Sequence, residues 1–108
     1  MIVSTSHELA GYRIDSVLGP VFGLTVRSRN AFSQAGAGLK SMFGGELKGM
    51  TKNLEESRQQ VIERMQARAE ELGANAVIAF RFDTSEMGGD WTEICAYGTA
   101  VVATPVSG

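Results

Sequence analysis

The segment from Leu54 to Phe82 constrains the fold of this chain more than any other. It begins with a long amphipathic pattern in which glutamate, glutamine and arginine, all good helix formers, occupy one side. This pattern predicts one long helix with a single buried face. The apolar or small residues of that face recur at steps of three, four and seven: Leu54, Val61, Ile62, Met65, Ala69 and Leu72.

The predicted helix has recognisable ends. Thr51 is a suitable N-cap, and Glu55 and Glu56 follow it near the positive end of the helix dipole. Gly73 suits the left-handed residue that commonly ends a helix. Between Thr51 and Leu72 such a helix would be about 33 Å long, at about 1.5 Å per residue.

Residues 76–82, after the turn, predict a strand that is apolar on both faces. The side chains of Ile78, Phe80 and Phe82 alternate onto one face, which we expect to lie under the helix. The opposite face is apolar in its first half, beginning with Val77. A strand of this kind needs cover on both sides, and one helix supplies only one of them.

Composition sets the broad class. The chain has 108 residues, of which 44% are hydrophobic, so we expect one packed domain spanning residues 1–108. A net charge of −2 gives no electrostatic case for nucleic acid or an anionic membrane as partner. No apolar run approaches the roughly 20 residues that cross a bilayer, and the first residues lack a signal-peptide pattern. The lone cysteine, Cys95, has no internal disulfide partner. We therefore expect a cytoplasmic protein.

The remaining elements complete an α+β architecture: one long helix packed on one face of a small, mainly antiparallel sheet of about three strands. We expect a short strand at residues 2–5, a strand at 12–26 that Gly19-Pro20 bends or bulges into two joined segments, a short helix within 30–43, a hairpin loop at 83–90 and a last strand at 91–103. The uncovered apolar sheet face predicts a closed homo-oligomer.

Several stretches of the chain resemble the YbjQ-like family of small bacterial proteins. The strongest is the helix-to-strand junction Leu72-Gly73-Ala74-Asn75-Ala76-Val77-Ile78-Ala79-Phe80-Arg81-Phe82-Asp83. Arg27-Ser28-Arg29-Asn30, Gly44-Gly45-Glu46 and Gly98-Thr99-Ala100-Val101-Val102 also match, so that the resemblance covers roughly residues 5–105. The chain departs from common members at Met50-Thr51, where an aromatic residue is more usual.

The resemblance implies a dodecin-like α+β subunit and a ring, with a pentamer as the expected assembly. The family label names heavy-metal binding, but the resemblance supplies neither an established activity nor a set of ligand residues. A possible metal ion is therefore the one cofactor that it suggests. The ring agrees with the uncovered sheet face.

The sequence itself offers few metal donors. Soft metals take clustered cysteine and histidine, and this chain has only Cys95 and His7, far apart. Packing in a strand is the commoner role for a cysteine like Cys95, although copies of it would recur around a ring axis. Four acidic residues lie around the last hairpin: Asp83, Glu86, Asp90 and Glu93. Their spacing matches no EF-hand loop, and a solvated hairpin is the simpler interpretation.

Two other kinds of binding site have weak signals. Gly44, Gly45 and Lys48 precede the long helix, where free backbone N–H groups could bind an anion; a helix connection is the alternative. The Lys40-Ser41 pair lacks the glycine that a phosphate-binding P-loop requires. The aromatic side chains of Tyr12, Trp91 and Tyr97 could stack on a flat ligand, as in dodecin-like assemblies, or pack in the core or an interface.

No nucleophile–base pair stands out in the sequence. The leading interpretation is a homo-oligomeric ring, expected to be a pentamer, that binds a small ligand or a heavy metal and has no evident catalysis. The alternative is an enzyme whose active site forms only between subunits, with Glu46, Arg58 or Arg81 from facing chains.

Overall fold

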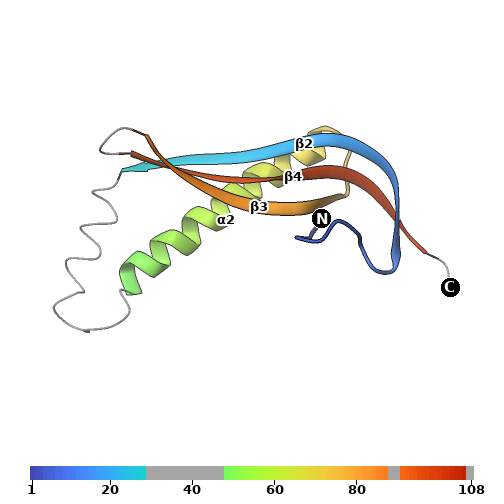
Figure 1. Cartoon of the computed structure of the whole chain (residues 1–108), viewed down its shortest axis with the longest axis horizontal. Coiled ribbons are helices and arrows are strands. Elements are labelled where there is room, and N and C mark those ends of the chain that lie inside the picture. Colours follow the sequence, from blue (N-terminus) through green and yellow to red (C-terminus); the bar gives the residue numbers. More distant parts are fainter. Residues whose placement is uncertain (29–47, 88–90, 107–108) are drawn as a thin grey trace.

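The computed structural model describes residues 1–28, 48–87 and 91–106. The chain forms one helix and four strands within these ranges (Figure 1). In chain order these elements are β1 (Ile2–Val3), β2 (Tyr12–Ser28), α2 (Lys48–Glu71), β3 (Ala76–Met87) and β4 (Trp91–Pro105). The α+β class is confirmed. The short helix expected within residues 30–43 lies outside the described residues.

The long helix begins earlier than expected and ends where expected. Because α2 starts at Lys48, Thr51 lies inside the helix and is not its N-cap. At the other end Gly73 has a φ of 88°, and the Ala74 N–H bonds the Ala69 carbonyl at 3.0 Å. This bond spans five residues around a left-handed glycine, which is the Schellman form of helix ending.

The sheet has four strands in the order β1-β3-β4-β2 and is mixed. β4 lies antiparallel to both of its neighbours, whereas β1 pairs in parallel with β3. The short strand expected at residues 2–5 is present as β1, but its parallel pairing, which makes the sheet mixed, was not predicted. The contact between β1 and β3 continues into the N-terminal segment, residues 4–11, where the Ser4 N–H donates to the Val77 carbonyl at 2.9 Å.

β2 is the opposite edge strand and runs unbroken from Tyr12 to Ser28. The bend expected at Gly19-Pro20 does not divide it into two strands. The other expected effect, a bulge, agrees with the pairing: β2 carries two register shifts against β4, and Gly19, at the second of them, has a φ of 129°. The loop expected at residues 83–90 is also shorter, since β3 continues to Met87, which pairs with Trp91.

The core beneath α2 depends on a close contact between the helix and β2. Val61, Met65 and Ala69 on the helix have no exposed surface. Val61 and Met65 meet Gly23 of β2, where an added Cβ would lie 2.0 Å from the Val61 carbonyl oxygen and 2.6 Å from the Met65 nitrogen. Glycine at this position lets the helix backbone rest directly on the strand. Leu54 and Leu72, expected to be buried, are 42% and 50% exposed.

A β-bulge in β3 overturns part of the predicted strand pattern. Ala79 has a φ of 53°, and the pairing with β4 shifts register between Ile78 and Arg81. The bulge moves one residue out of the alternation. Phe80 therefore packs against the core under α2, as predicted, and so does Phe82, but Ile78 lies on the opposite face.

The face of the sheet opposite α2 is covered at one end only. There Ile78 forms a second cluster with Val101 and Ala103, and Leu9 of the N-terminal segment packs over it. Towards the other end the strand register leaves apolar side chains uncovered, each 39–53% exposed. We call these residues the open-face patch: Phe22, Leu24, Val26, Trp91 and Tyr97.

The described part of the chain has one helix, and it is too polar to cross a membrane.

Candidate functional site

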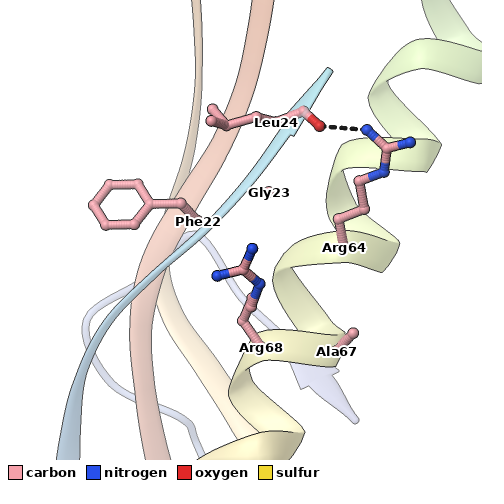
Figure 2. Close-up of a pocket in the computed structure, with 6 residues that line it drawn as sticks. All are labelled: Phe22, Gly23, Leu24, Arg64, Ala67 and Arg68. Atoms are coloured by element: carbon pink, nitrogen blue, oxygen red, sulfur yellow. Dashed lines mark hydrogen bonds between the residues drawn. The ribbon is translucent and has the colours of Figure 1, made fainter.

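A groove lies between α2 and the free edge of β2 (Figure 2). Its volume is about 580 Å³, which falls within the usual range for small-molecule sites. We call it the α2–β2 groove. Its lining residues are Phe22, Gly23 and Leu24 of β2 and Arg64, Ala67 and Arg68 of α2.

The close approach at Gly23 creates the groove. Because α2 rests on the strand there, side chains one turn apart on the helix lie beside the edge of β2. Both guanidinium groups, from Arg64 and Arg68, project from α2 towards β2, whereas the Phe22 ring points away from the helix (Figure 2). The walls of the groove are therefore β2 backbone on one side and two cationic side chains on the other.

Arg64 is held in place by the strand. Its Nη1 donates to the Leu24 carbonyl oxygen at 2.5 Å, and this oxygen points away from β4 (Figure 2). In an antiparallel strand the N–H and C=O of one residue point to the same side. The Leu24 N–H therefore also faces the groove, and β4 does not use it.

Arg68 makes no hydrogen bond or ion pair with any residue that the structure describes. Glu71 lines a smaller adjoining hollow of about 200 Å³ beside Arg68, but the two side chains form no ion pair. An arginine guanidinium is always charged and offers five N–H donors in a planar fork. The groove thus carries two positive charges and no carboxylate on its own lining.

The expected aromatic surface is partly present. The strand register places Trp91 and Tyr97 on the same face of β4, as their spacing predicted, and both belong to the open-face patch. Tyr12 lies at the far end of β2, opposite Pro105, and does not join them. The sequence therefore predicted a shared surface, but not the contribution of three apolar residues from β2.

The anion site expected at Gly44, Gly45 and Lys48 lies outside what the structure describes. Gly44 and Gly45 fall between the described ranges, and Lys48 is the first residue of α2, with its side chain undescribed. Glu46, one of the residues considered for catalysis, also falls outside these ranges.

The donors for a heavy metal do not converge. No group of three or more histidine, cysteine, aspartate or glutamate side chains gathers within residues 1–28, 48–87 and 91–106. Cys95 is 8% exposed on β4, paired with Leu24, whereas His7 lies in the N-terminal segment. Burial raises the pKa of the Cys95 thiol, and the carboxylates of Glu93 and Asp83 raise it further. Since the thiolate is the metal ligand, the described side chains of one subunit do not fit such a site.

The acidic residues of the last hairpin are spread along two strands. Asp83 pairs with Cys95 across the β3–β4 ladder, and Ser85 pairs with Glu93. Asp90 lies outside the described residues. The carboxylates thus flank the cysteine without closing around a common point.

The two arginines considered for catalysis have structural partners within their own subunit. The Arg58 guanidinium lies 4.9 Å from the centre of the Phe82 ring. Arg81 donates to the backbone carbonyls of Thr5 and Phe80 at 2.8 and 2.7 Å, tying β3 to the N-terminal segment.

The sequence pattern did not predict the α2–β2 groove, because it places arginine on the side of the long helix that faces away from the sheet. The usable signal was the separation of Arg64 and Arg68 by four residues, which puts both on one stripe of a helix. Their nearness to the edge of β2 depends on Gly23, and a sequence pattern does not show which strand a helix will cross.

The chain is similar to a known family and to proteins of several bacteria. A family model described as "Putative heavy-metal-binding" matches residues 1–104. A UPF0145 protein of Acidothermus cellulolyticus is 64% identical over 100 residues, covering 93% of each chain. A UPF0145 protein of Streptomyces coelicolor is 59% identical over 102 residues, covering 94% of this chain and 96% of its own.

A solved structure supports the same fold. A crystallised protein of unknown function from Pediococcus pentosaceus, assigned to the DUF74 family, superposes with a TM-score of 0.56 at 16% identity. The match covers 96% of this chain and 98% of that one. At this identity the likeness speaks for the fold alone. The sequence matches go further, and they show that the chain belongs to the YbjQ family of UPF0145 proteins.

Proposed function

We propose that this YbjQ-family protein is a non-catalytic, homo-oligomeric protein that binds a small ligand in the α2–β2 groove. Its assembly is a closed ring, for which five subunits is the count that we expect. The cytoplasm is its expected location. The observation that carries the proposal is the open-face patch, a set of large apolar side chains that neither α2 nor the N-terminal segment covers.

A second copy of the chain is the natural cover for this patch. Contiguous exposed apolar surface on a small protein usually marks an interface. The patch spans two adjacent strands, with Phe22 directly opposite Tyr97 and Leu24 opposite Cys95. In a closed ring each copy would cover the patch of one neighbour with a different part of its own surface, so that no patch is left exposed.

The α2–β2 groove is the proposed place for the ligand. It borders the patch, because Phe22 and Leu24 contribute backbone to the groove and side chains to the opposite face of the sheet. A ligand in the groove therefore contacts a strand that the assembly would hold rigid. Pre-organisation of this kind strengthens binding.

Heavy-metal binding, which the family description names, is the second candidate. It would require donors from several subunits, since the described residues of one subunit do not gather them. A titration of the intact assembly with zinc, followed by dialysis and metal analysis, tests this candidate. Retained metal that is lost in Cys95→Ser would favour it over the groove.

The assembly is tested by light scattering of the purified full chain at micromolar concentration. We expect a single species whose mass is a multiple of the 11.5 kDa subunit, five-fold for a pentamer. Val26→Glu places a charge in the patch and is expected to shift the protein towards single subunits. Val106→Glu is the matched control, because Val106 is 60% exposed and lies beyond β4. A stable wild-type monomer at these concentrations would refute the assembly.

A further inference from the structure

We propose that the α2–β2 groove binds a small organic oxyanion, a carboxylate or a phosphate ester, held by Arg64, Arg68 and the backbone N–H of Leu24. This inference rests on the proposed function, for which it names the ligand class. It starts from an imbalance of charge, since both charged side chains on the groove lining are cationic.

The donors converge on one part of the groove. Arg64 and Arg68 are one helical turn apart and both project towards β2 (Figure 2). Arg64 uses Nη1 for the Leu24 carbonyl, which fixes its orientation and leaves its other N–H groups available. The Leu24 N–H faces the same space, because it lies on the same side of the strand as the carbonyl that Arg64 binds.

The chemistry of these donors selects an oxyanion. A guanidinium matches the two oxygens of a carboxylate or phosphate with parallel hydrogen bonds. A backbone N–H at a strand edge adds a neutral donor without side-chain entropy. A ligand supplying only apolar surface would leave these donors unpaired, which is costly in a partly enclosed site.

The size of the groove indicates that the anion is part of a larger molecule. About 580 Å³ exceeds the space that one carboxylate or phosphate group fills. The remaining walls are Ala67 and the backbone at Gly23, which suit a small organic body. Glu71, in the adjoining hollow, disfavours a second anionic group near Pro20, so the ligand carries its charge at one end.

The test is an NMR titration of the intact protein with benzoate and with phenyl phosphate, and benzyl alcohol is the neutral control. We expect saturable shifts of the Leu24 amide and of the Arg64 and Arg68 Nε signals with one or both anions. The tighter of the two anions identifies whether the site prefers carboxylate or phosphate. Benzyl alcohol is expected to leave these signals unchanged.

Three variants locate the binding. Arg68→Gln removes one charge and is expected to weaken anion binding at least tenfold, or about 1.4 kcal/mol. Ala67→Phe fills the groove without changing its charge and is expected to abolish binding. Lys52→Gln, an exposed lysine on the same helix, is the matched control and is expected to leave the affinity unchanged.

The inference is overturned if neither anion shifts the groove signals, if benzyl alcohol binds as well as they do, or if Lys52→Gln weakens binding as much as Arg68→Gln. Light scattering on the same samples separates this failure from that of the assembly. If the protein is an intact oligomer and binds neither anion, only the proposed ligand class is refuted. If the wild type is a monomer, the proposed assembly is refuted.

Discussion

Gly23 is the residue on which the packing of α2 depends. A Cβ at this position would lie 2.0 Å from a backbone oxygen and 2.6 Å from a backbone nitrogen of the helix, and neither atom has a side-chain rotamer through which to move away. The helix as a whole would have to shift. Because Val61 and Met65 are fully buried at this contact, a shift also loosens the core beneath them.

Gly23→Ala is therefore expected to lower the free energy of unfolding by about 1–3 kcal/mol, the usual range for overpacking a core. Chemical denaturation followed by circular dichroism measures this change. The matched control is Ser16→Ala on the same strand, where the side chain is exposed and the expected change lies within about 0.5 kcal/mol. Equal stabilities for the two variants would show that the helix does not rest on Gly23.

Cys95 should behave as a buried thiol. Burial raises its pKa, and Glu93 and Asp83 act in the same direction. We expect alkylation by iodoacetamide to be slow at pH 7 and to rise with pH to a midpoint above that of the same chain unfolded in urea, because the thiolate is the reactive form.

The raised pKa of Cys95 makes the free energy of unfolding depend on pH. The folded state keeps the Cys95 proton at pH values where the unfolded state has lost it. The corresponding stability is present below the unfolded pKa and is lost as pH rises through the raised folded pKa. A folded-state midpoint at or below the unfolded one would contradict the burial of the thiol, and it would reopen Cys95 as a metal ligand.

At the scale of elements, local signals were predictable and long-range ones were not. The amphipathic period predicted α2, and Gly73 predicted its end, because helix capping depends on neighbouring residues. The bulge at Ala79 was missed because an alanine with positive φ has no local signature. Its conformation is set by the N-terminal segment, where the Ser6 carbonyl accepts the Ala79 N–H at 2.9 Å.

In the candidate site, too, the local feature was visible in the sequence and the long-range contact was not. The arginines of α2 were visible in the sequence, but the edge of β2 that completes the groove was not assigned to them. Pairing order in a sheet depends on contacts between residues far apart in the chain. The parallel β1–β3 pair was missed for the same reason, since two residues carry too little pattern to predict a strand partner.

The turn between α2 and β3 is fastened to the last strand by one side chain. The Asn75 Nδ2 donates to the Ala103 carbonyl at 2.7 Å, and its Oδ1 accepts from the Ala103 N–H at 2.8 Å. The amide thus imitates a strand neighbour and holds the helix–strand junction against β4. Asparagine suits this role because its side chain carries both a donor and an acceptor.

Asn75→Asp is expected to destabilise the protein by about 1–3 kcal/mol at pH 7, because a carboxylate oxygen would face the Ala103 carbonyl without a proton to share. Lowering the pH should recover part of the loss as the carboxyl becomes protonated. Asn75→Ala, which removes both bonds without repulsion, is the comparison and should show no such recovery. Thermal denaturation of the variants between pH 4 and 7 measures these effects, and a pH-independent Asn75→Asp would exclude the repulsion.

The whole molecule presents an asymmetry between the two faces of its sheet. α2 covers one face, whereas the N-terminal segment covers only part of the other. The open-face patch then leaves five large apolar side chains between 39% and 53% exposed. In the proposed assembly, burying them between copies would couple folding to association, so that the stability of each subunit would depend on the total protein concentration.

The melting temperature of the wild type is therefore expected to rise by several degrees Celsius when the protein concentration is raised from about 1 to about 100 µM, because mass action favours the assembled state. Val26→Glu should melt at a lower temperature and show little concentration dependence, since it disrupts the patch. Val106→Glu should follow the wild type. Differential scanning calorimetry at the two concentrations measures this. If the wild-type melting temperature does not change with protein concentration and light scattering shows single subunits, the open-face patch is exposed to water in the folded protein and the proposed association is refuted.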